Sequence, residues 1–125
     1  MLTVVPVYAA ILALLFLALS VRVIVDRRRQ RVGFGTGGNA ILERRIRVHA
    51  NFCEYVPLAL LLLAMAELRG AGHLWLHALC VSLVIGRLAH AIGLARPGTD
   101  DVGRIVGMTG SQTAILGGAM LILFG

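Results

Sequence analysis

The segment ERRIRVHANFCEYVP, residues 43–57, carries polar side chains at the spacing of a helix face. Arg47, Asn51, Glu54 and Tyr55 are spaced i, i+4, i+7 and i+8, so one side of a helix presents all four. Glu54 lies about 10 Å beyond Arg47 along the axis. A carboxylate in an apolar segment needs partners. Either Glu54 pairs with an arginine to hold the helices together, or it belongs to a binding site.

Two later segments carry similar stripes. In GRLAHAIGL, residues 86–94, Arg87 and His90 are spaced i, i+3 on one face. Further on, the spacing i, i+4, i+7, i+8 relates Arg104, Met108, Ser111 and Gln112. A lone histidine at a helix end, or Ser and Gln inside a span, usually serves structure alone. Because three stripes converge on one level, we expect a cationic, partly buried pocket for a small anionic ligand.

Other kinds of site are disfavoured. Cys53 and Cys80 lie in apolar runs without metal-ligand spacing, so we expect no metal. The glycine-rich stretch at 32–39 lacks the GK[ST] ending of a phosphate loop. No aromatic residues are interleaved with the arginines in a nucleic-acid-binding module, so we expect no nucleic acid partner.

The elements that position these stripes are four apolar helices. Of the 125 residues, 58% are hydrophobic and 14% charged, and the mean hydropathy is +0.87, outside the range of soluble domains. Apolar runs at about 2–25, 41–69, 73–95 and 104–124 are each long enough to span a bilayer. We therefore predict an all-α integral membrane four-helix bundle, a single domain over residues 1–125. So little polar surface also predicts oligomerisation.

All twelve basic residues are arginines, and their distribution predicts the topology. Only Arg69 falls on the side of the second loop. The side of the first and third loops holds arginines 22, 27, 28, 29, 31, 44, 45, 47, 87, 96 and 104. Positive residues favour the cytoplasmic side. We therefore expect a multi-pass protein of the cell inner membrane with both termini on the non-cytoplasmic side.

The segment RIRVHANFCEYVP resembles the R-x-x-x-N-x-x-E-x-x-P signature of the MAPEG family, the membrane-associated proteins in eicosanoid and glutathione metabolism. The resemblance, which is to the small bacterial branch above all, covers nearly the whole chain. It includes GRLAHAIG and the arginine that opens the fourth helix with Gln112 eight residues on.

This resemblance implies a homotrimer that binds glutathione between neighbouring subunits near the cytoplasmic side. It implies that Arg104 stabilises the glutathione thiolate. The residues implied in binding are Arg22, Arg47, Asn51, Glu54, Tyr55, Arg87, His90 and Gln112. The chemistry agrees, because arginines suit the two carboxylates of glutathione and Glu54 suits its ammonium.

Three positions depart from the family's eicosanoid enzymes. Leu94 stands where several of these enzymes have tyrosine, and Ala50 and Ile105 stand where the prostaglandin synthase type has arginine and serine. They argue against an eicosanoid synthase. We expect a glutathione transferase or peroxidase that acts on lipophilic electrophiles arriving through the bilayer. The alternative is a non-enzymatic membrane protein whose pocket binds an anionic lipid headgroup or another thiol. A proton-coupled exporter is disfavoured, because the first helix has no carboxylate before Asp26.

Overall fold

The computed structural model of the protein describes residues 1–95 and 100–125, and at positions 95 and 100 it describes the backbone alone. In these residues the chain forms four helices, which are α1 (Val5–Gln30), α2 (Ala40–Leu68), α3 (His73–Ala95) and α4 (Asp100–Phe124). Each is long and apolar enough to cross a membrane. The predicted all-α class with four spans is confirmed.

Three helix boundaries differ from the predicted ones by three residues or more, and the first is the start of α1, which lies at Val5 and not at about residue 2. α1 continues beyond residue 25 to Gln30, because arginines are good helix formers and are favoured in the last turn by the helix dipole. α4 begins at Asp100, four residues before Arg104, since acidic residues are favoured in a first turn. The expected loop residues 96–99, with Arg96, lie outside the described residues.

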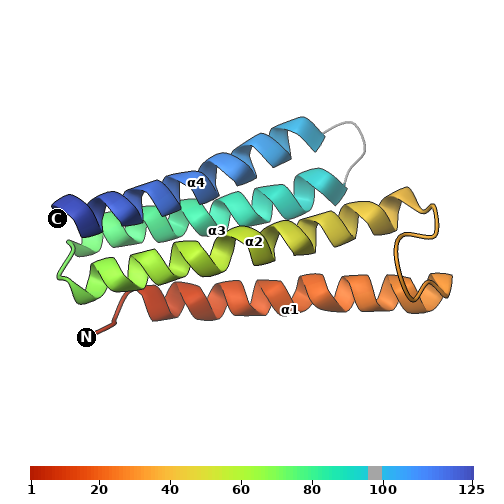
Figure 1. Ribbon diagram of the computed structural model, residues 1–125, viewed down its shortest axis with the longest axis horizontal. Helices are drawn as coiled ribbons and strands as arrows, with labels where there is room; N and C mark the ends of the chain where they lie inside the picture. Colours follow the sequence, from red (N-terminus) through yellow and green to blue (C-terminus); the bar gives the residue numbers. More distant parts are fainter. Residues whose placement is uncertain (96–99) are drawn as a thin grey trace.

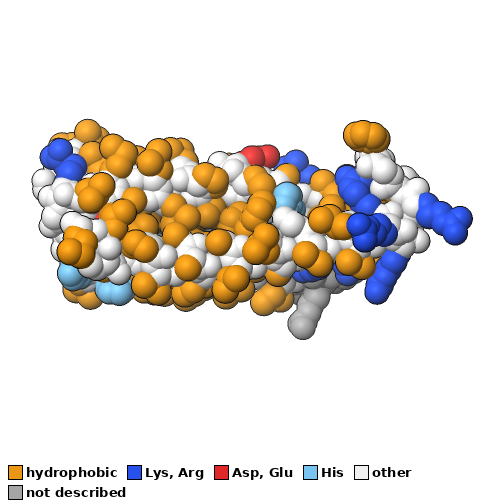
Figure 2. Space-filling model, turned by 90° about the horizontal axis from the view of Figure 1, so that it is seen from below, with side chains coloured by type: hydrophobic (Ala, Val, Ile, Leu, Met, Phe, Trp, Pro, Cys, Tyr) orange, Lys and Arg blue, Asp and Glu red, His pale blue; other side chains and the backbone are white. Residues whose placement is uncertain are grey.

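The helices run the length of an elongated bundle, with both termini at the same end (Figure 1). Figure 2 shows the basic side chains gathered mainly at the opposite end, where α1 connects to α2. Asn39 caps the start of α2 there, because its Oδ1 accepts a hydrogen bond of 2.9 Å from the Leu42 N–H. Among the described residues, the arginines that the sequence places on one side thus gather mainly at one end of the structure.

Helices α3 and α4 pack against each other through glycines. A Cβ added to Gly107 would lie 2.5 Å from the Cβ of His90, and one added to Gly110 would lie 2.6 Å from the carbonyl oxygen of Ser82. Small residues allow the backbones of membrane helices to approach closely. This approach brings the first turns of α4 against the end of α3, at the arginine-rich end.

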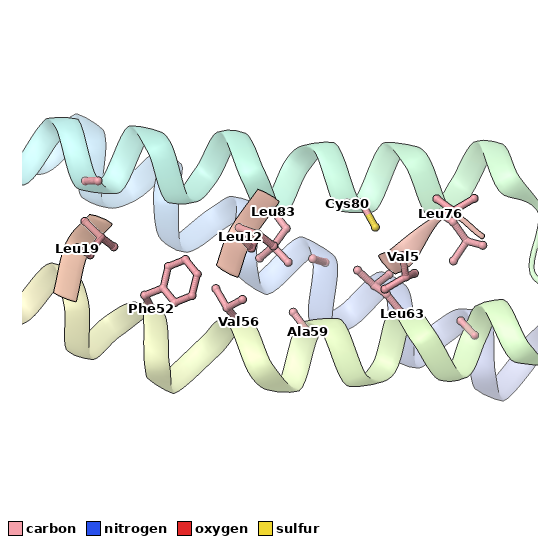
Figure 3. Packing of buried hydrophobic residues seen from close by; sticks show 14 of the residues in the cluster. Val5, Leu12, Leu19, Phe52, Val56, Ala59, Leu63, Leu76, Cys80 and Leu83 are labelled. Carbon is pink, nitrogen blue, oxygen red and sulfur yellow. The ribbon is translucent and has the colours of Figure 1, made fainter. Parts of the chain in front are cut away.

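The apolar core runs along the bundle between α1, α2 and α3 (Figure 3). Phe52, Val56 and Leu63 of α2 meet Leu12 of α1 and Leu83 of α3 in this core. In the described part of the chain, α1 packs on α2 and α3 but not on α4. The polar stripes of α2, α3 and α4 are therefore held together without α1.

At the end with the termini, Glu67 ties α2 to the start of α1. Its carboxylate accepts hydrogen bonds from the backbone N–H groups of Thr3, Val4 and Val5 at 2.5, 2.6 and 2.8 Å, and from the Thr3 hydroxyl at 3.0 Å. The first N–H groups of a helix have no partner within the helix. Glu67 supplies that partner from another helix, so it locks the axial position of α1.

Candidate anion-binding site

A cavity of about 310 Å³ opens between α2, α3 and α4 at the arginine-rich end. We call it the arginine cavity. Its lining comprises Arg47, Asn51, His90, Leu94, Arg104 and Met108. Four of these six residues are predicted site residues, and they come from all three polar stripes. The structure thus brings the stripes together at one level, as their spacing predicts.

The charge of the arginine cavity is positive. Arg47 and Arg104 line it and are exposed, whereas His90 is only 3% exposed. Among the described residues that line it there is no carboxylate. Two guanidinium groups in one concave site favour an anion with several oxygens, because each guanidinium can donate two parallel hydrogen bonds.

Arg87 lies behind the cavity and is only 2% exposed. Its Nη1 donates to Oδ1 of Asn51 at 2.6 Å, and its Nη2 donates to the carbonyl oxygen of Gly107 at 2.6 Å. Within the described chain its Nε has no hydrogen-bond partner. Arg87 therefore connects α3 to both α2 and α4 and does not line the cavity itself.

Asn51 faces the cavity between this arginine and α4. Its Nδ2 donates to Sδ of Met108 at 3.5 Å. A thioether sulfur is a weak acceptor. A ligand oxygen or a thiolate in the cavity would be a stronger acceptor for the same N–H group.

Arg104, the predicted thiolate-stabilising residue, stands in the second turn of α4 at the mouth of the cavity. Its Nη2 donates to Oδ1 of Asp101 at 3.0 Å, and both side chains are well exposed. An exposed ion pair of this kind is weak. The guanidinium of Arg104 can therefore leave Asp101 for a ligand at little cost.

A profile of the MAPEG family matches residues 5–124. The chain belongs to the MAPEG family. Similar proteins include the Inner membrane protein YecN of Escherichia coli K12 and that of Escherichia coli O6:H1 (strain CFT073), each 38% identical to this chain over 86 residues. The aligned segment spans 69% of this chain and 66% of each relative, just under two thirds of their length.

Three other predicted site residues of this MAPEG protein lie outside the arginine cavity. Glu54 and Gln112 are exposed, and Tyr55 is half-buried. Glu54 stands in the middle of α2, one turn beyond Asn51. In the described part of the chain Glu54 has no hydrogen bond or ion pair. The Glu54 carboxylate is therefore exposed on the surface of the chain.

Arg22 is also separate from the arginine cavity. It lines a second cavity of about 370 Å³, between α1 and α3, whose other lining residues are apolar. In this MAPEG protein, Arg22 thus does not line the same cavity as Arg47, Asn51, His90 and Arg104.

Several polar contacts were not predicted from the sequence. Asp26, only 6% exposed, forms an ion pair with Arg45 that joins α1 to α2. Ser20 and His49 are 2.9 Å apart in a hydrogen bond between the same helices. The partners are 19 and 29 residues apart, so local spacing carries no signal for them.

Ser111, which belongs to the polar stripe of α4, is fully buried. Its hydroxyl donates a hydrogen bond to the Gly107 carbonyl of the same helix, so Ser111 stabilises α4 itself.

Proposed function

We propose that this MAPEG protein binds glutathione in the arginine cavity and uses its thiolate on lipophilic electrophiles or peroxides. The observation that carries the proposal is the pair Arg47 and Arg104 in one cavity whose described lining has no carboxylate. Glutathione has two carboxylates, and its thiolate is a third anionic group. Arg47 suits a carboxylate, while Arg104 at the cavity mouth suits the sulfur, because a nearby guanidinium favours the thiolate over the thiol.

The proposed transfer reaction is a substitution at carbon. The thiol proton passes to water, the thiolate forms a C–S bond with the electrophilic carbon, and the leaving group departs with the electrons of its bond. With a peroxide, one thiolate attacks the peroxide oxygen and becomes a sulfenic acid, while the O–O bond breaks and the leaving alkoxide takes a proton from water to give the alcohol. The thiol of a second glutathione then attacks the sulfenic sulfur, which yields the disulfide and water. In both cases the apolar substrate reaches the cavity from the bilayer.

Glu54 supports a homotrimer as the binding species. An unpaired carboxylate halfway along a membrane-spanning helix is costly when it faces lipid. A neighbouring subunit would cover Glu54, and the Glu54 carboxylate would then accept hydrogen bonds from the ammonium group of glutathione. Light scattering of the detergent-solubilised protein is expected to give the mass of three chains, and a monomer that binds glutathione would contradict this part of the proposal.

The proposed location is the inner membrane, as the name of the YecN relatives states for those proteins. The arginine-rich end would then face the cytoplasm, and both termini the opposite side. A C-terminal alkaline phosphatase fusion is expected to be active, and a fluorescent protein at the same position is expected to stay dark. The reverse result would invert the orientation.

Isothermal titration of the purified protein with glutathione tests the proposal. We expect the wild type to bind, and Glu54→Ala to bind about tenfold more weakly, since one charge-assisted hydrogen bond is lost. The matched control is Glu43→Ala, because Glu43 is an exposed glutamate in the first turn of the same helix. Failure of the wild type to bind glutathione would overturn the proposed function.

Leu94 favours a second candidate, a protein that binds an anionic lipid headgroup or another thiol without turnover. Leu94 lines the arginine cavity at the position where several eicosanoid enzymes of the MAPEG family have a tyrosine, so the cavity lacks the hydroxyl of that tyrosine. Such a protein would be thermally stabilised by its ligand. It would not turn over a chlorodinitrobenzene in the presence of glutathione.

A further inference from the structure

We propose that Arg87 is a positioning residue, which fixes the orientation of the Asn51 amide so that the arginine cavity offers an N–H donor at this point. The group bound beside Asn51 must then be a hydrogen-bond acceptor, such as a carboxylate or a thiolate, and not an ammonium. Arg87 itself does not touch the ligand. The part of this inference that concerns the ligand rests on the proposed function.

The orientation follows from the chemistry of the two side chains. A guanidinium has only donors, whereas an amide has an acceptor on one side and donors on the other. The Nη1 of Arg87 lies 2.6 Å from the Asn51 side chain. At that distance only the amide oxygen can face it, because two N–H groups would repel each other. The Nδ2 of Asn51 must therefore point the other way, toward Met108 and the cavity.

The position of Arg87 is itself strongly constrained. It is 2% exposed, and its second amino group donates to the carbonyl of Gly107 at 2.6 Å. Gly107 packs so closely against His90 that an added Cβ would lie 2.5 Å from the histidine Cβ. Because α4 cannot move away without losing both contacts, the guanidinium is held between two helices and holds Asn51 in turn.

The present acceptor of the Asn51 N–H group is readily replaced. The contact with the Met108 sulfur is 3.5 Å long and weak. Donation from a buried cation to Oδ1 also polarises the amide, which strengthens its N–H as a donor. An anionic acceptor in the cavity therefore gains both from this N–H and from Arg47 on the preceding turn of α2. An ammonium would meet three donors, so it must bind elsewhere, beside Glu54.

Binding measurements with three variants test this positioning role. Asn51→Asp keeps an oxygen toward Arg87 but turns an oxygen toward the cavity, so we expect unchanged or higher thermal stability and at least about tenfold weaker glutathione binding. Arg87→Met frees the amide to turn, and we expect a similar loss of affinity. Arg87→Lys keeps a donor-only group and is expected to bind glutathione more tightly than Arg87→Met. Equal affinity of the Lys and Met variants would overturn the proposal.

A second measurement needs no ligand. The chain has two asparagines, Asn39 and Asn51, so labelling with ¹⁵N-asparagine gives signals from two side-chain amide groups, one pair for each. Arg87→Met is expected to shift the Asn51 signal and speed its hydrogen exchange, while Asn39 serves as the internal control. The exposed Arg28→Met is the matched arginine control. Unchanged Asn51 signals in Arg87→Met would overturn the positioning role.

This experiment distinguishes failure of the positioning role from failure of the proposed function. Glutathione is expected to shift the Asn51 signal of the wild type and leave that of Asn39. If Arg87→Met alters the Asn51 signal but glutathione does not, the positioning role is supported and the proposed function is overturned. If glutathione shifts Asn51 equally in the wild type and in Arg87→Met, glutathione binding is supported and the positioning role is overturned.

Discussion

The two ends of the bundle treat their polar groups differently. At the end with the termini, Glu67 accepts four hydrogen bonds from the start of α1, and Tyr8 is hydrogen-bonded to His77 at 2.8 Å. In the arginine cavity, Arg47 has no hydrogen-bond partner in the part of the chain that the structure describes, and Arg104 is bonded there only to the exposed Asp101.

This difference separates groups that stabilise the fold from groups that remain available to a ligand. In a membrane, a saturated network such as that of Glu67 contributes to stability, because the alternative is a bare polar group in an apolar medium. Unsaturated donors in a cavity have no such compensation until an anion arrives. We therefore expect substitutions at the two ends to affect different properties.

The largest effect is expected for Arg104→Ala at the arginine-rich end. Transferase activity with glutathione and a chlorodinitrobenzene should fall about a hundredfold, because the variant loses the group that stabilises the negative charge of the glutathione thiolate. The free energy of unfolding should change by less than about 0.5 kcal/mol, because the side chain is exposed and its ion pair weak. Activity that equals that of the exposed control Arg28→Ala would contradict the assigned role.

An intermediate effect is expected for Glu67→Gln at the other end. The new amide group would face backbone N–H donors, and we expect the free energy of unfolding to fall by about 2 to 3 kcal/mol. Glutathione affinity should stay as in the wild type. Denaturation in mixed detergent micelles measures the first quantity and titration calorimetry the second, with Glu43→Gln as control. A loss of affinity without a loss of stability would break the contrast between the two ends.

The smallest effect is expected for Asp101→Asn. Asp101 accepts a hydrogen bond from Arg104 at 3.0 Å and so competes with a ligand for that guanidinium. Its removal should raise the affinity for glutathione about twofold, in line with a weak exposed ion pair. Titration calorimetry at low salt measures the change. Weaker binding would instead mean that Asp101 holds Arg104 in its binding position.

Much of the fold and part of the site could be predicted from the sequence. The spacing of Arg47 and Asn51 places them on one face, and they do share a cavity with His90 and Arg104. The sequence predicted that Arg87 binds the ligand directly, but in one chain Arg87 does not line the cavity. Spacing along a helix does not say how far a side chain is turned into the bundle. Arg87 lies behind the cavity and reaches Asn51 from there.

By itself the sequence determined the four spans, the gathering of arginines at one end and the family, because hydropathy, helical period and short motifs are local properties of the chain. Only the tertiary structure decided which stripes meet. The close glycine contacts between α3 and α4 set their distance and rotation, and thereby bring Arg104 to the cavity. The packing of α1 on α2 and α3 decides that Arg22 lines a different cavity and that Glu67 holds a helix that begins 62 residues earlier. Such contacts depend on how whole helices pack, which no local pattern specifies.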